Sequence, residues 1–173
     1  MPHFEDLSDY IYHNSMFWAP GTKNIGWLSS EHGFLRSEPS EVFLDKIWSF
    51  CKISVAQMRG IHECDLCSGG RTYYVKRGGE PLLLGSSEIR VFSDHGDIYA
   101  APTLIYHYIA THHYSPPDEF LRAVDQGPCP PDHAYFDRLS SAGLAWNDTS
   151  APSELPERFK YVREGDQFVK KLV

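Results

Sequence analysis

The chain has no long hydrophobic run and no excess of basic residues. No apolar stretch approaches the roughly 18 residues that a membrane-spanning helix needs, and residues 1–15 lack the basic start and apolar core of a secretory signal. Lys and Arg number 16 against 23 Asp and Glu, for a formal net charge of −7. Proteins that bind nucleic acid through its phosphates are normally basic. We therefore expect a cytoplasmic protein whose partner is neither a membrane nor a nucleic acid, which leaves a protein partner open.

Cysteine is also scarce, with four residues in a chain of 173. Without an export signal, so few cysteines favour metal or redox use over a disulfide framework. We interpret Cys51 as a buried helix residue and Cys129 as a loop thiol, because neither has a close partner in the sequence. Hydrophobic residues at 42% and aromatic residues at 14% exclude a disordered chain and predict an aromatic core.

The spacing of apolar residues predicts a single α+β domain. Apolar residues between Ser40 and Cys51 recur on one helical face, with Ser37 or Ser40 available to start the helix. Residues 55–100 alternate short β-prone runs with glycine turns, which predicts an antiparallel meander rather than a parallel sheet. Residues 101–113 predict a buried helix. A further helix is expected after Ser115 as its N-cap, ending near Gly127.

The composition changes after residue 126. Residues 1–126 are expected to form the α+β domain, with about three helices packed on the meander. Residues 127–173 are expected to form an irregular extension packed on that domain, because they contain Pro128, Pro130, Pro131, Pro152 and Pro156. Residues 159–162 and 167–173 could add a hairpin at its end.

The only cluster with chemically meaningful spacing is RGIHECDLC, residues 59–67. If this stretch is a strand, His62 and Cys64 project to the same side, and a tight turn can bring Cys67 back to them. Imidazole and thiolate ligands converging on one point suit tetrahedral Zn²⁺. A thioredoxin-like redox pair would instead need a helix after the cysteines, where Ser-Gly-Gly follows.

The fourth ligand has to come from elsewhere in the chain. His107 lies in the middle of the predicted buried helix, where a metal on one ring nitrogen and a hydrogen bond on the other would satisfy the imidazole. A core histidine bonded to a carbonyl and a tyrosine is the other reading. The predicted ligand set is His62, Cys64, Cys67 and His107. In the alternative, His107 and His112 are both ligands if the helix end tightens, and His62 supports the site from outside the set.

These residues stand in three blocks that resemble a family of small uncharacterised bacterial proteins. The blocks are RGIHECDLC, LLLGSSEIRV and YAAPTLIYHYIATHHYSPPDEFLRAV, and the resemblance covers residues 1 to about 125. The family is a domain of unknown function, so the resemblance implies no reaction. It does imply that His62, Cys64, Cys67 and His107 form one unit.

No motif of a catalytic centre accompanies the candidate zinc site. The sequence has no HExxH, GxSxG or paired-carboxylate motif, and we predict no catalytic residue. The first hypothesis is a structural zinc site in a non-enzymatic interaction or immunity-type protein. The alternative is a metal-dependent hydrolase in which Glu88 or His112 carries a proton. A zinc-ribbon nucleic-acid binder ranks third because of the negative charge.

Overall fold

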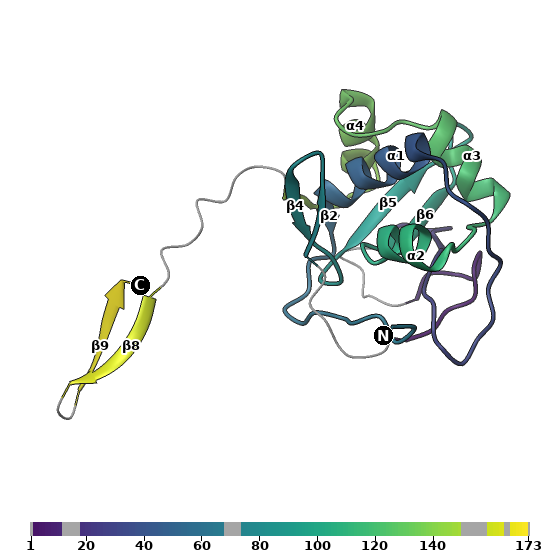
Figure 1. Ribbon diagram of the computed structural model, residues 1–173. Coiled ribbons are helices and arrows are strands. Elements are labelled where there is room, and N and C mark those ends of the chain that lie inside the picture. The colour runs from purple at the N-terminus through teal and green to yellow at the C-terminus, as the bar shows by residue number, and fades with distance from the viewer. Residues whose placement is uncertain (1, 12–17, 68–73, 150–158, 165–166, 173) are drawn as a thin grey trace.

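A five-stranded sheet of order β1-β6-β5-β2-β7 forms the centre of the protein (Figure 1). The computed structural model describes residues 2–11, 18–67, 74–149, 159–164 and 167–172. The strands are β1 (Lys23–Asn24), β2 (Ile53–Val55), β3 (Tyr74–Arg77), β4 (Glu80–Leu83), β5 (Glu88–Phe92), β6 (Ile98–Pro102), β7 (Trp146–Asp148), β8 (Phe159–Glu164) and β9 (Gln167–Leu172). All five residues of β5 are buried, which makes this strand the middle of the core.

Four helices accompany the sheet in the described residues: α1 (Glu41–Lys52), α2 (Ile105–His112), α3 (Asp118–Gln126) and α4 (His133–Ser141). Ser40 caps α1, since its side chain accepts a hydrogen bond from the Phe43 N–H at 3.2 Å. α1, α3 and α4 each contact β5, and α2 contacts α1. Ile47 and Phe50 of α1 are fully buried, so the apolar face of this helix closes the core over the sheet.

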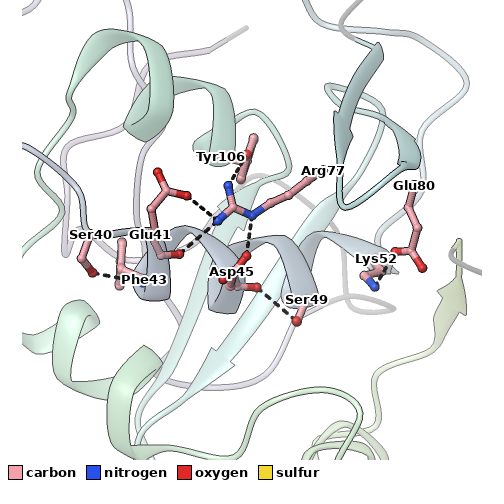
Figure 2. A network of polar contacts seen from close by, with 9 residues as sticks. All are labelled: Ser40, Glu41, Phe43, Asp45, Ser49, Lys52, Arg77, Glu80 and Tyr106. Atoms are coloured by element: carbon pink, nitrogen blue, oxygen red, sulfur yellow. Dashed lines mark hydrogen bonds and ion pairs between the residues drawn. The ribbon is translucent and has the colours of Figure 1, made fainter.

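The hairpin of β3 and β4 is a separate two-stranded sheet that is attached to α1 by ion pairs. Figure 2 shows the Arg77 guanidinium of β3 between Glu41 and Asp45 of α1, at 2.9 and 2.5 Å. A second pair joins Lys52 at the end of α1 to Glu80 of β4, at 2.7 Å. Together these contacts fix the position of the hairpin that follows the cysteine loop in sequence.

The predicted α+β single-domain fold is confirmed, with differences in detail. β2, β5 and β6 pair antiparallel as expected. β3 and β4 form a separate sheet, however, and β1, which precedes the predicted meander in sequence, pairs with β6 in parallel. The predicted helix over 101–113 begins only at Ile105, since Ala101 and Pro102 pair with β5. The next helix uses Pro117, not Ser115, as its N-cap residue.

The chain continues in regular structure beyond residue 126. Tyr135 and Leu139 of α4 are fully buried, and β7 pairs with β2 at an edge of the sheet. β8 and β9 pair with each other as a hairpin. The division of the chain at residue 126 remains a prediction. Across the part of the chain that the structure describes, every helix is too short or too polar to cross a bilayer.

Candidate metal centre

The loop of residues 59–67 carries the two cysteines, and it contains no strand. Backbone hydrogen bonds attach it to the turn between β4 and β5. Met58 N–H donates to Ser86 O, and His62 N–H donates to Gly85 O, both at 2.7 Å. Gly85 has φ of +89°, and a Cβ added there would lie 2.3 Å from His62 O. Only glycine allows this close approach, so Gly85 positions the loop that holds the ligands.

A tight turn at Asp65 and Leu66 brings the two cysteines together. The backbone N–H groups of Leu66 and Cys67 both hydrogen-bond to the Cys64 sulfur. Cys64 is buried, with 3% of its surface exposed, whereas Cys67 is half-buried. N–H donors aimed at a sulfur stabilise its thiolate form, which is the form that binds metal. The local backbone of this turn therefore already suits a metal ligand.

The two histidines come from the opposite side, at the middle and the end of α2. In a regular α-helix, side chains five residues apart lie about 140° apart around the axis. Here the His113 N–H bonds to Tyr108 O, five residues back instead of four, and the Tyr114 N–H reaches the same oxygen at 3.1 Å. His113, at φ 57°, ends α2 directly after His112 as the left-handed residue of a C-terminal cap. The ring centroids of His107 and His112 lie 5.0 Å apart.

The four ligand atoms of Cys64, Cys67, His107 and His112 all lie within 4.8 Å of one another. His112 Nε2 is 3.3 Å from each sulfur, and His107 Nε2 is 3.4 Å from Cys67 Sγ. Tetrahedral zinc, with Zn–S bonds of about 2.3 Å and Zn–N bonds of about 2.0–2.1 Å, separates S and N ligands by about 3.6 Å and two sulfurs by about 3.8 Å. The four atoms therefore fit around one tetrahedral ion after small movements.

Burial favours the uncharged forms of His107, His112 and Cys64 when no metal is bound. Desolvation, and then the neighbouring His112, lower the pKa of His107 to about 4. Desolvation also lowers the pKa of His112, helped by Arg36 and His113. Burial raises the pKa of Cys64 to about 11. Near neutral pH the imidazoles thus have lone pairs ready for a metal ion, and Cys64 has a proton to give up.

The second ring nitrogen of His107, Nδ1, also has a hydrogen-bond partner, the Thr111 hydroxyl. Thr111 Oγ1 lies 3.3 Å from His107 Nδ1, four residues further along α2. If Nε2 binds a metal, Nδ1 carries the hydrogen and donates it to this hydroxyl, which fixes the ring orientation. Thr111 was not among the residues predicted from the sequence, although the i, i+4 spacing of His107 and Thr111 places their side chains on one face of a helix.

His62 lies outside the group of four ligand atoms. Its side chain is half-buried and lines a small cavity together with Met58, Gly85 and Glu88. Its backbone holds the loop to Gly85, as described above. The expected alternation placed His62 beside Cys64, but a loop does not alternate its side chains as a strand does. Of the predicted ligands, the structure brings together Cys64, Cys67 and His107, with His112 as the fourth member.

Glu88, considered above as a proton carrier, is occupied by other partners. Its exposed fraction is 2%, and both carboxylate oxygens accept the Tyr10 hydroxyl, at 2.9 and 3.0 Å. Arg90, fully buried, forms an ion pair with Glu88 at 2.6 Å and lies over the Tyr10 ring. The Tyr10 hydrogen bonds join the N-terminal segment to β5, and the buried ion pair lies within β5 itself. The Glu88 carboxylate therefore takes part in structural contacts with Tyr10 and Arg90.

Comparison with known proteins identifies the family but no activity. No curated protein sequence and no solved structure matches this chain. A family model described as a domain of unknown function, DUF7919, matches residues 2–125, which include the cysteine loop and all of α2. The predicted resemblance to an uncharacterised family is confirmed, and the chain belongs to the DUF7919 family of domains of unknown function.

Proposed function

We propose that this chain is a zinc protein whose metal ion has a structural role, and that it acts as a non-enzymatic interaction protein. The single observation that supports this most strongly is the convergence of Cys64, Cys67, His107 and His112 within 4.8 Å. Two thiolates and two imidazoles form a complete tetrahedral set, whereas a catalytic zinc keeps one position open for water or substrate. Neutral imidazoles and soft sulfur also favour zinc over the oxygen-preferring ions Mg²⁺ and Ca²⁺.

The bound ion would join two parts of the molecule that are distant in sequence. The cysteines belong to the loop that leads toward β3, and the histidines belong to α2, which packs on α1. The loop has few backbone hydrogen bonds of its own, so a metal ion is a strong means of holding it against the helix. The structural role that we propose for the ion is this cross-link between the cysteine loop and α2.

The test is to measure metal content together with thermal stability. Protein purified under reducing conditions without chelator is expected to contain one zinc ion per chain by elemental analysis. A ligand present at 1,000 times its Kd stabilises the folded state by about 4 kcal/mol. At about 2–4 °C per kcal/mol for a chain of this size, chelation is expected to lower Tm by about 8–16 °C.

In the hydrolase alternative, chelation abolishes a hydrolytic activity while the chain remains folded. Because any ion that binds only the folded state raises Tm, the loss of an activity, and not the size of the Tm shift, identifies this alternative. A chain that contains no zinc and takes up none would refute both versions.

A further inference from the structure

We propose that Cys67 is a site of two-electron oxidation, at which a hydroperoxide joins Cys64 and Cys67 in a disulfide and releases the metal ion. This inference rests on the zinc site proposed above and adds a means of regulating it. The geometry that supports it is the proximity of the two sulfurs, which lie within 4.8 Å of each other in a Cys-x-x-Cys turn. Pairs with this spacing form disulfides readily in redox proteins.

The two sulfurs differ in how well they are protected. Cys64 is 3% exposed, and its sulfur accepts the N–H groups of Leu66 and Cys67. Cys67 is half-buried, and its neighbour in the cluster, His112, is half-buried as well. An oxidant that approaches from solvent therefore reaches the side of the cluster where Cys67 and His112 lie. Cys67 is the attacking sulfur, and Cys64 is positioned to resolve the first product.

The reaction balances with a hydroperoxide as the oxidant. With hydrogen peroxide, the Cys67 thiolate attacks one oxygen, the O–O bond breaks, and hydroxide leaves, so Cys67 becomes a sulfenic acid; an alkyl hydroperoxide reacts at its terminal oxygen and releases an alkoxide instead. The Cys64 thiolate then attacks the Cys67 sulfur, an S–S bond forms, the S–O bond breaks, and a second hydroxide leaves. Two electrons pass from the two thiolates to the peroxide, and the two hydroxides are neutralised by two protons from the buffer. The disulfide sulfurs no longer carry charge, so the ion loses two of its four ligands.

The other two cysteines provide an internal comparison. Cys51 is buried at 1% exposure, and burial raises its pKa, so it stays an unreactive thiol. Cys129 is half-buried like Cys67 but lies apart from the cluster, with its sulfur 3.4 Å from Pro130 O. Burial raises the pKa of Cys129 too. Cys67 has the Cys64 sulfur within 4.8 Å to convert the first oxidation product into a disulfide, whereas Cys129 lies apart from the cluster, and this difference directs disulfide formation to Cys67.

The experiment uses the full zinc-loaded chain and hydrogen peroxide as the probe. Zinc release is followed with a colorimetric chelator, and cysteine states are mapped by mass spectrometry after trypsin digestion. Cleavage after Arg59 and Arg71 leaves Cys64 and Cys67 on one peptide, with Cys51 and Cys129 on others. We expect one zinc released for each disulfide formed within residues 60–71, and recovery of binding after a thiol reductant and zinc are added. The variant Cys129→Ser is the matched control and should release zinc at the same rate.

The possible outcomes separate this inference from the proposed function. If the reduced chain contains no zinc and takes up none, the zinc site itself is wrong. If zinc is bound but peroxide leaves it in place, or oxidises Cys129 first, or produces sulfinic acids without a disulfide, the oxidation site is wrong while the zinc site stands. Zinc release that is coupled to the disulfide supports both.

Discussion

The fourth ligand offers the sharpest test of the site, because two histidines make opposite predictions. His112 Nε2 lies 3.3 Å from both cysteine sulfurs, whereas His62 lies outside the cluster and contributes its backbone to Gly85. Structural zinc sites bind with about 10–16 kcal/mol near neutral pH, or about 3 kcal/mol for each of four ligands. We therefore expect His112→Ala to weaken zinc binding by about two orders of magnitude.

The matched control is His62→Ala, which removes a half-buried side chain while leaving the loop backbone in place. His62 is not among the four converging ligand atoms, so zinc affinity should change by less than about fivefold, or about 1 kcal/mol. The assay is competition with a chromophoric chelator of known affinity, at fixed pH and under reducing conditions. Strong loss in His62→Ala with retention in His112→Ala would refute the assignment and favour His62, Cys64, Cys67 and His107.

Three further predictions concern the surroundings of the cluster. Gly85→Ala places a Cβ 2.3 Å from His62 O, so the loop must move; we expect a loss of at least about 2 kcal/mol in urea unfolding and weaker zinc binding. Glu88→Ala leaves the Arg90 charge buried without its carboxylate and should lower the free energy of unfolding by about 3–5 kcal/mol in the same assay, with zinc content unchanged. Glu88→Gln should lower it by less, and equal losses in the two variants would contradict the ion-pair explanation. Zinc binding near neutral pH should release at least one proton, because the raised pKa of Cys64 keeps it a thiol, and none from the already neutral His107, so affinity should fall at least about tenfold per unit decrease in pH. Calorimetry in buffers of different ionisation enthalpy measures this count, and a count near zero would contradict thiolate ligation.

The Tyr10, Glu88 and Arg90 contacts explain why the N-terminal segment belongs to the same core as the sheet. Both oxygens of the Glu88 carboxylate receive the Tyr10 hydroxyl, and the guanidinium of Arg90 lies 4.8 Å from the Tyr10 ring centre. Three buried polar side chains satisfy one another here, which lets two charges stay in the interior. This network accounts for a buried glutamate without assigning it to catalysis.

Local sequence determined most of the elements and most of the candidate ligands. Ser40 with the apolar spacing of residues 43–51 was enough to predict α1, because capping and amphipathic periodicity act within one or two turns. The Cys-x-x-Cys turn could be predicted from the sequence equally well, since its geometry depends on four consecutive residues. A histidine in an apolar helix likewise indicated that His107 needs a partner.

Only the tertiary structure decided which histidine completes the cluster and which strands share the central sheet. His112 joins the cluster because α2 lies against the cysteine loop, so that His112 Nε2 is 3.3 Å from the sulfurs of Cys64 and Cys67. His62 is held away because residues 59–67 dock as a loop on Gly85, where strand alternation does not apply. Both outcomes depend on contacts between segments distant in sequence, and the periodicity of residues along the chain gives no information about such contacts.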